Sequence, residues 1–326
     1  MPMPARVYAP TPANLRRLAK ALRRGDLVAI PTETVYGLAA HALDPKACRA
    51  IFRAKRRPAN DPLIVHVLDL SRAEDLAVFN PAARRLARRF WPGPLTLVLP
   101  KKSGVPGIVT SSGPTVAIRA PAHPLARRLL RLAEIPLAAP SANLFGYISP
   151  TTAAHVRAGL GTRIPHILDG GACAMGVEST VLDMTDPKRP RVLRPGVVTA
   201  AQLRQFLGVK VHDAKSRSPR ARQRAPGMLE RHYSPRTPLV LRHPEAQPPA
   251  GVAIVRLRMP GAKPGQHVFW LSRRGALTEI ARNLYGVLRQ ADAGGYRQIW
   301  VEPLPVESGG LAATINDRLR RAAAKR

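Results

Sequence analysis

The chain has 326 residues, 45% of them hydrophobic, so it is long enough for two domains with buried cores and is not a wholly disordered protein. Its 52 lysines and arginines outnumber 20 acidic residues, and the formal charge of +32 favours partners that carry phosphate. A solvated surface rich in arginine explains this excess equally well, so charge alone supports phosphate binding only weakly.

An α/β pattern runs through residues 1–207, beginning with leucines at helical spacing between Thr11-Pro12 and Gly25. Including that first segment, we predict helices at 11–24, 45–55, 71–78, 81–89, 124–133, 151–158 and 199–207. Strands are predicted at 27–31, 63–68, 95–99, 115–119, 136–140, 166–168, 180–184 and 191–193. The two kinds of element interleave without the strict alternation of a doubly wound fold. This pattern favours an open, twisted mixed sheet of the α/β class.

The composition changes after Leu207. Residues 208–236 form a predicted linker, because their first part carries scattered Arg, Ser and Pro without apolar periodicity. The segment Pro226-Gly-Met-Leu-Glu-Arg-His-Tyr-Ser-Pro235 is unusual for a linker, since it holds a Met, a His and a Tyr. Residues 237–326 predict a second, smaller Rossmann-like α/β domain. Its strands are expected at 238–242, 251–256, 267–271 and 297–301, and its helices at 276–290 and 309–323.

Polar side chains cluster where apolar strands end. Pro31-Thr-Glu-Thr-Val-Tyr-Gly-Leu38 follows one strand, and Lys55-Arg-Arg-Pro-Ala-Asn-Asp-Pro-Leu-Ile-Val-His66 places three cations before another. Open α/β sheets bind ligands in this position. The chain has neither a Walker A motif nor a G-x-G-x-x-G loop, so side chains would have to bind a nucleotide.

Four cations mark an anion site: Lys55, Arg57, Arg119 and Arg194. Each alone is consistent with a solvated surface cation. Together, at strand ends beside Pro or Gly turns, they favour a phosphate or carboxylate ligand.

Hydroxyl groups form the second pattern. Ser141 and Asn143 follow the strand at 136–140, whereas Thr151, at the start of a helix, is explained equally well as an N-cap. His66 fits a buried core histidine as well as a ligand contact. There is no partner for a Ser–His–Asp triad, and no His and carboxylate spacing typical of a metal site. The pattern therefore indicates positioning and charge neutralisation, as in nucleotidyl or phosphoryl transfer.

Two cysteines, Cys48 and Cys173, exclude a four-cysteine zinc site and a disulfide framework. No segment is typical of a signal peptide or a membrane span, which predicts a soluble, cytoplasmic protein without a membrane partner.

Taken together, these motifs resemble the YrdC-like family, specifically its two-domain L-threonylcarbamoyladenylate synthases. The resemblance covers residues 10–207 nearly end to end. It rests on the two motifs above and on Phe90-Trp-Pro-Gly-Pro-Leu-Thr-Leu97, Val116-Ala-Ile-Arg119, Pro140-Ser-Ala-Asn143, Ser149-Pro-Thr151, Glu178-Ser-Thr180 and Leu193-Arg-Pro-Gly196. The linker motif and, less specifically, Asn316-Asp-Arg318-Leu and Ala322 are similar to the rest of the long form.

The resemblance implies a reaction that joins L-threonine, bicarbonate and ATP, with Mg²⁺ on the phosphates, into threonylcarbamoyl-AMP and pyrophosphate. The product serves the threonylcarbamoyladenosine modification of tRNA, so tRNA or downstream threonylcarbamoyl-transfer proteins are the implied partners. Residue by residue, it assigns L-threonine to Thr34, His66, Arg119 and Ser179, with Ser141 between the two substrates. It assigns ATP to Lys55, Arg57, Thr115, Asn143, Ser149 and Arg194, with His232 or Tyr233 as a lid. Lys55, Arg57 and Arg119 are the implied catalytic cations.

One position departs from the family pattern. Asp61 stands where relatives often have Asn, and an acid beside triphosphate repels it unless Mg²⁺ intervenes, so Asp61 is a candidate metal or water contact on the ATP side. Neighbouring Asn60 is a candidate substitute for that Asn.

Two rival functions fit less well. The charge also suits a module that binds double-stranded RNA or tRNA without making an adenylate, but the chain has only 5% aromatic residues for base stacking. A carbamoyl-transfer enzyme of hydrogenase maturation would need zinc-finger cysteines that this chain lacks. For the last 90 residues or so, two functions are equally consistent with the sequence: closing the domain and docking a partner.

Overall fold

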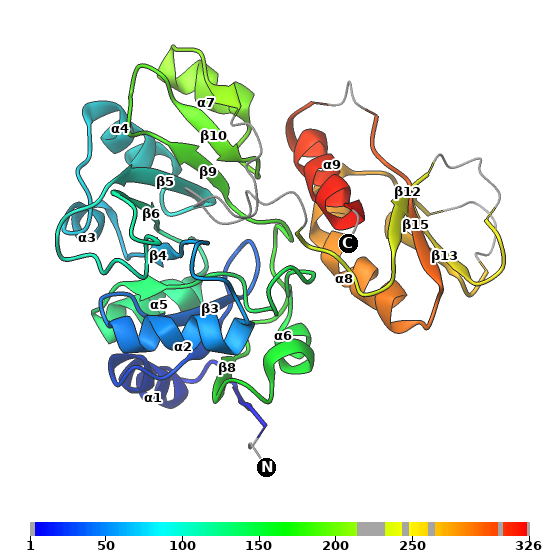
Figure 1. Cartoon of the computed structure of the whole chain (residues 1–326), viewed down its shortest axis with the longest axis horizontal. Coiled ribbons are helices and arrows are strands. Elements are labelled where there is room, and N and C mark those ends of the chain that lie inside the picture. The colour runs from blue at the N-terminus through cyan, green and yellow to red at the C-terminus, as the bar shows by residue number, and fades with distance from the viewer. Residues whose placement is uncertain (1–3, 214–231, 243–247, 260–264, 306–308, 325–326) are drawn as a thin grey trace.

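The computed structural model describes residues 4–213, 232–242, 248–259, 265–305 and 309–324. They form two α/β units side by side, a larger one from the N-terminal part of the chain and a smaller one from the C-terminal part (Figure 1). Most of the predicted linker, including the cations from Lys215 to Arg224 and the start of the Pro226 motif, lies outside the described residues.

The larger unit is built on an eleven-stranded sheet in the order β1-β8-β2-β3-β7-β4-β6-β5-β9-β10-β11. Some neighbours are parallel, such as β4 with β6, and others antiparallel, such as β2 with β3. The predicted open mixed sheet is therefore confirmed. The strands are β1 (Arg6–Tyr8), β2 (Val28–Ile30), β3 (Gly37–His41), β4 (Ile64–His66), β5 (Leu95–Pro100), β6 (Thr115–Arg119), β7 (Leu137–Ala138), β8 (His166–Leu168), β9 (Thr180–Asp183), β10 (Arg191–Arg194) and β11 (His212–Asp213).

Helices cover this sheet, and local sequence explains where several begin. Thr11 caps the first helix by accepting a hydrogen bond from the Asn14 backbone, and Pro12 occupies its first turn, where no N–H is needed. Asp44 and Asn80 cap two others, each also followed by Pro. The helices are α1 (Pro12–Arg23), α2 (Pro45–Lys55), α3 (Leu70–Glu74), α4 (Pro81–Phe90), α5 (Pro124–Ala133), α6 (Ala153–Leu160) and α7 (Ala200–Leu207).

Strand register brings distant polar residues together. Parallel pairing of β4 and β6 sets His66 opposite Arg119. Ser141 forms a backbone bridge to Gly37, so the segment after β7 lies against the start of β3. These contacts explain how motifs far apart in sequence meet at one place.

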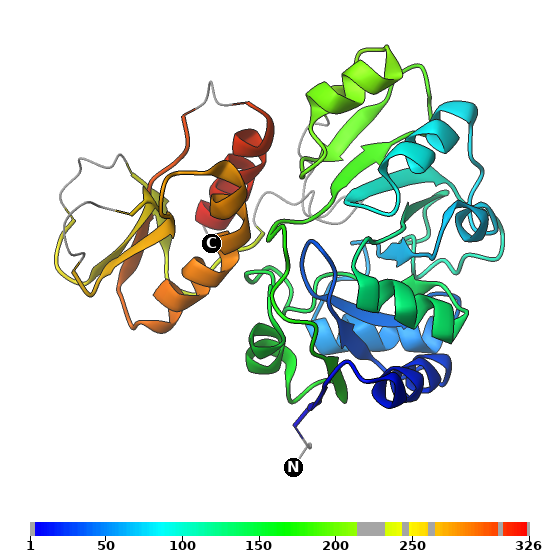
Figure 2. The ribbon, with the colours of Figure 1, turned by 180° about the vertical axis from the view of Figure 1, so that it is seen from behind.

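The smaller unit has four strands in the order β12-β15-β13-β14, all parallel. Its elements are β12 (Leu239–Leu241), β13 (Val252–Arg258), β14 (Val268–Ser272), α8 (Leu277–Ala293), β15 (Gln298–Val301) and α9 (Gly310–Ala323). The predicted smaller Rossmann-like unit is confirmed. Helices α8 and α9 lie on the side of its sheet that faces the larger unit (Figures 1 and 2).

Among the described helices, none combines the length and apolarity needed to cross a membrane.

A few elements differ from the sequence prediction. Strands β1, β3 and β11 were not predicted, and α3 ends at Glu74 instead of residue 78. Helix α6 begins at Ala153, two residues late, because Thr152 is its N-cap. Strand β11 pairs with β10, so the larger sheet reaches Asp213, beyond the predicted end of that domain at Leu207.

Candidate active site

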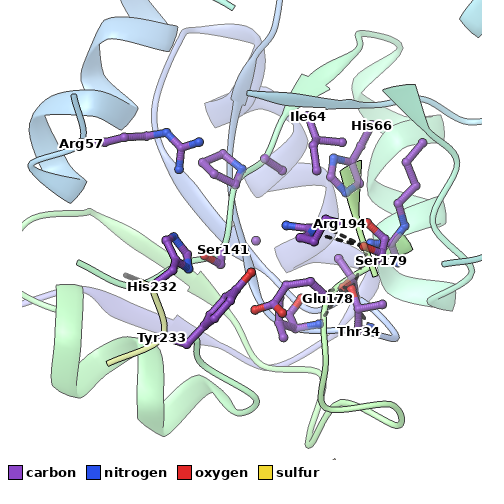
Figure 3. A pocket seen from close by; sticks show the side chains of 16 residues that line it. Thr34, Arg57, Ile64, His66, Ser141, Glu178, Ser179, Arg194, His232 and Tyr233 are labelled. Atoms are coloured by element: carbon purple, nitrogen blue, oxygen red, sulfur yellow. Dashed lines mark hydrogen bonds between the residues drawn. The ribbon is translucent and has the colours of Figure 1, made fainter. Parts of the chain in front are cut away.

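One cavity, of about 40 Å³, collects most of the predicted site residues (Figure 3). Three arginines from separate parts of the larger unit line it, together with hydroxyl side chains and two aromatic residues of the linker. Its lining residues are Thr32, Thr34, Val35, Gly37, Arg57, Ile64, His66, Arg119, Ala139, Pro140, Ser141, Glu178, Ser179, Arg194, His232 and Tyr233.

Arg119, the last residue of β6, is anchored on three sides. Its Nη2 forms an ion pair of 2.6 Å with Glu33, its Nη1 donates to the Thr34 hydroxyl at 3.0 Å, and its Nε donates to the Gly93 carbonyl at 3.1 Å. Burial alone would raise the pKa of Glu33, but the Arg119 charge and hydrogen bonds outweigh it and hold that pKa below its usual value. Arg119 is thus a fixed cation with a known orientation.

His66 lies beside Arg119 and is almost completely buried. Burial, and then the Arg119 charge, lower the pKa of His66 to about 3, although the Glu33 carboxylate opposes this. The imidazole is therefore neutral at physiological pH, and its Nδ1 is buried without a hydrogen-bond partner in the structure. A neutral imidazole beside a cation can contact a substrate without repelling it.

Ser179 is held by the neighbouring strands. The Arg194 guanidinium donates to the Ser179 carbonyl from Nε and Nη2, at 3.1 and 3.0 Å, and from Nη2 to its hydroxyl at 3.1 Å. The Thr96 hydroxyl lies 2.8 Å from the Ser179 hydroxyl. Position and orientation of Ser179 are therefore fixed from both sides.

Lys55 is the last residue of α2 and Arg57 lies two residues further on, and their surroundings differ. Lys55 is buried, and its Nζ donates to the carbonyls of Ser141 and Asn143 at 2.5 and 2.6 Å. Burial, and then the Arg57 charge, hold the pKa of Lys55 well below its usual value. Lys55 thus fixes the backbone of the 141–143 segment, whereas Arg57 reaches the cavity.

Asp61 is fully buried and forms an ion pair of 2.9 Å with Arg57. Burial raises the pKa of Asp61, although Arg57 and Lys55 oppose this. The carboxylate faces the Arg57 guanidinium and is not part of the cavity lining. Its predicted role toward a metal ion or water stays a prediction.

Three other predicted ATP residues also lie outside the lining. The Asn143 amide donates to the carbonyls of Leu144 and Tyr147, both at 2.8 Å, and the Ser149 hydroxyl donates to Glu178 at 2.6 Å. Thr115 begins β6, at the end opposite Arg119. Asn143 and Ser149 hold the surrounding loops, and the contacts of all three residues to ATP stay predictions.

The linker enters the site through His232 and Tyr233, both buried. Their rings meet edge to face with centroids 4.1 Å apart, and Tyr233 adopts a left-handed backbone with φ of 63°. The following residue, Ser234, donates its backbone N–H to the Gly146 carbonyl at 2.8 Å. This contact and the left-handed Tyr233 hold the end of the linker against the larger unit.

The structure therefore brings together Thr34, Arg57, His66, Arg119, Ser141, Ser179, Arg194, His232 and Tyr233. Glu33 and Glu178 lie within two of the sequence motifs, but the sequence predicted no role for either. Each acid turns out to pair with a buried arginine, Glu33 with Arg119 and Glu178 with Arg318. The predicted cluster of cations could have identified these two acids, because buried cations require acids nearby.

Comparison with known proteins gives consistent matches along the chain. Residues 20–196 match a family model, Sua5/YciO/YrdC, described as "Telomere recombination", and residues 198–324 match one described as "Threonylcarbamoyl-AMP synthase, C-terminal domain". The threonylcarbamoyl-AMP synthase of Pyrococcus abyssi is 42% identical over 96% of this chain and 95% of its own length. That of Bacillus subtilis is 41% identical over 96% and 94%.

Solved structures agree with the sequence matches. The crystal structure of P. abyssi Sua5 complexed with L-threonine superimposes with a TM-score of 0.87, at 38% identity, covering 98% of each chain. The same two-unit architecture is therefore present in both proteins. The chain belongs to the YrdC-like family, in its two-domain threonylcarbamoyl-AMP synthase branch.

Proposed function

We propose that this protein is an L-threonylcarbamoyladenylate synthase, which makes threonylcarbamoyl-AMP and pyrophosphate from L-threonine, bicarbonate and ATP. The observation that carries the proposal is the convergence of Arg57, Arg119 and Arg194 on one cavity with the hydroxyls of Thr34 and Ser179. Membership of the family supports it. This arrangement suits two anionic substrates far better than it suits base stacking on RNA.

L-Threonine would bind at the Arg119 end. A guanidinium has five N–H groups, and the Arg119 contacts described above engage three acceptors, so donors remain for a carboxylate. Neutral His66 and the fixed hydroxyls of Thr34 and Ser179 would accept or donate hydrogen bonds to the rest of the amino acid. Ser141, which lies near His232 (Figure 3), would contact either substrate.

ATP would bind toward Arg57 and Arg194. Carboxylation of the threonine amine by bicarbonate gives a carbamate and releases water, and a carbamate oxygen then attacks the α-phosphorus of ATP. A new oxygen–phosphorus bond forms as the bond to pyrophosphate breaks, and negative charge builds up on the phosphate oxygens. Fixed arginines neutralise this charge without reorganising, which is the main contribution a protein makes to such a transfer.

Mg²⁺ would be held mainly by the triphosphate, since the described residues contain no cluster of three His, Cys, Asp or Glu side chains suited to a metal. Bound in that way, it would supply charge neutralisation at the leaving pyrophosphate.

The linker would act as a lid. Sites for small molecules usually measure roughly 300–1,000 Å³, whereas this cavity measures about 40 Å³. Among the described residues that line it, His232 and Tyr233 are the two that come from the linker. We infer that they move to admit ATP and close again to keep water from a labile acyl-adenylate.

The deciding experiment is pyrophosphate release by the purified protein with ATP and Mg²⁺, with and without L-threonine and bicarbonate. Release that requires both substrates supports the synthase. Absence of release, together with tight and salt-sensitive RNA binding, would favour the RNA-binding module instead.

The lid has its own test, in a variant that carries both His232→Ala and Tyr233→Ala. We expect faster hydrolysis of the adenylate and a lower product yield per pyrophosphate released. Unchanged yield would contradict the lid.

Because threonylcarbamoyl-AMP is a labile activated acyl group, its consumer must be close by. We infer that downstream threonylcarbamoyl-transfer proteins acting on tRNA receive it, in the cytoplasm. Co-purification of such proteins with a tagged form of the chain would test this step.

A further inference from the structure

The smaller unit is joined to the larger one by a packed, apolar interface. Val35, Ile148 and Val177 of the larger unit share one core cluster with Leu284 and Leu288 of α8. A packed apolar contact of this kind resists domain motion. The two units therefore share an apolar core at this point.

Arg318 of α9 is buried at that interface, and its side chain points at the active-site wall. Its Nε forms an ion pair of 2.8 Å with Glu178, and its Nη2 donates to the Pro195 carbonyl at 2.7 Å. Its guanidinium also lies over the Tyr233 ring, 4.9 Å from the centroid. One side chain of the smaller unit thus contacts two residues that line the cavity, Glu178 and Tyr233.

The Glu178 carboxylate collects further contacts. The Tyr285 hydroxyl of α8 lies 3.1 and 2.9 Å from its two oxygens, and the Ser149 hydroxyl donates to it at 2.6 Å. Burial would raise the pKa of Glu178, but the charges of Arg318 and then Arg194, with these hydrogen bonds, hold it below the usual value. The carboxylate is therefore ionised, and most of its partners belong to the smaller unit.

We propose that Arg318, assisted by Tyr285, is a positioning residue for the reaction: the smaller unit fixes the Glu178 carboxylate, contacts the Tyr233 ring when the lid is closed, and so completes the cavity wall. The inference rests on the proposed synthase function. Glu178 directly precedes Ser179, so a shift of its side chain would displace the Ser179 hydroxyl, and through its hydrogen bond it would also displace Ser149. Without Arg318 a buried carboxylate would lose its nearest cation and move or take up a proton.

The test compares steady-state kinetics of pyrophosphate release in Arg318→Met, Arg318→Lys and Tyr285→Phe. Arg320→Met is the matched control, because Arg320 carries the same charge on the same helix but is exposed. We expect kcat/KM to fall about 100-fold in Arg318→Met, the size seen when a reacting group is misplaced by about 1 Å. Tyr285→Phe should lose about tenfold, as expected for one hydrogen bond to a charged group. Arg318→Lys should recover part of the activity, and Arg320→Met should match the wild type.

The pH profile separates positioning from a purely structural role. The groups that face Glu178 are Arg318, Arg194, Tyr285 and Tyr233, and burial raises the pKa of both phenols above their usual value. Removal of Arg318 should therefore raise the pKa of Glu178 and shift the loss of activity at acid pH to higher pH.

Wild-type activity is measured first, since its absence would contradict the proposed function itself. If the wild type is active, folded Arg318→Met and Tyr285→Phe with unchanged kcat, KM and pH profile would overturn the inference, even if their melting temperatures fall. If Arg318→Met does not fold, Arg318→Lys and Tyr285→Phe decide by the same criterion.

Discussion

The two α/β units differ most in where they bury polar groups. The larger unit buries several charged side chains around one cavity, among them Lys55, Arg57, Arg119 and Arg194. In the described part of the smaller unit, from residue 237 onward, the buried polar or charged side chains are Ser272, Thr314 and Arg318. The latter two contact the larger unit.

This difference indicates that the larger unit carries the reaction and that the smaller unit supports it. Burying a charge costs several kcal/mol even when it is paired, so proteins concentrate buried charges where chemistry needs them. The larger unit offsets that cost with pairs such as Arg119–Glu33 and Arg57–Asp61. The described part of the smaller unit has an ordinary apolar core, and its Arg318 forms a buried ion pair with Glu178 of the larger unit at the interface between the two.

The strongest test of this contrast is Arg119→Ala. Removing a buried, hydrogen-bonded charge should weaken L-threonine binding by about 4 kcal/mol, or roughly a thousandfold, while ATP binding remains. Isothermal titration calorimetry measures both, with exposed Arg128→Ala as the control. Wild-type threonine affinity in Arg119→Ala would contradict the assignment. Adding Glu33→Gln relieves the unpaired carboxylate and separates lost binding from lost stability.

A matching change in the smaller unit should affect stability only. Ile299 is fully buried in β15, between β12 and β13, and does not line the cavity. Ile299→Ala should lower the free energy of unfolding by about 3 kcal/mol. Chemical denaturation measures this loss. The contrast between the units fails if threonine affinity of the folded variant falls as well.

The interface between the two units can be tested at Gly176. A Cβ there would lie 2.4 Å from the Ala281 carbonyl oxygen and the Arg282 Cα of α8, and the residue has a φ of 73°. Gly176→Ala should cost about 2 kcal/mol from this overlap in addition to about 1 kcal/mol for the left-handed backbone. Gly171→Ala is the control, since Gly171 has a φ of 76° but open space around it. Equal melting temperatures in the two variants would show that the units do not pack as described.

The smallest effect concerns pH. His66 has its pKa lowered from 6.5 to about 3 in the folded protein, so between these values the unfolded chain binds the extra proton. The free energy of unfolding should therefore fall as the pH falls from about 6 to 4, by at most about 1.4 kcal/mol per pH unit for this residue. His155 and His232 have lowered pKa values and add to the slope. Denaturant titrations of His66→Asn should show a shallower slope, and an unchanged slope would contradict a neutral His66.

Local sequence patterns predict much of this fold. The β-branched runs that became β4 and β6, and the Thr-Pro and Asp-Pro helix starts, predict their elements directly. Strand β3 was missed because Gly37-Leu-Ala-Ala-His41 has low strand propensity. Its two neighbours in the sheet, β2 and β7, determine its conformation, and that is tertiary information.

The candidate site was predictable to a similar degree. Cations at strand ends predicted Arg119 and Arg194, because the position of such residues in an α/β sheet is itself informative, whereas Ser179 was assigned only through the family resemblance. The sequence could not show that the Lys55 ammonium group donates hydrogen bonds to backbone carbonyls instead of facing the cavity. It also could not show that Arg318, about 140 residues away from Glu178, completes the wall.

The short strand β4 limits how the chain can vary in length. Ile64 and His66 face the cavity, while Val65 between them belongs to the apolar core. Side chains alternate along a strand, so deleting or inserting one residue in the turn before Ile64 would exchange these faces. Val65 would then enter the cavity, and His66 would be placed in the core. Changes of length in this turn are therefore tolerated only when they preserve the pairing of His66 with Arg119.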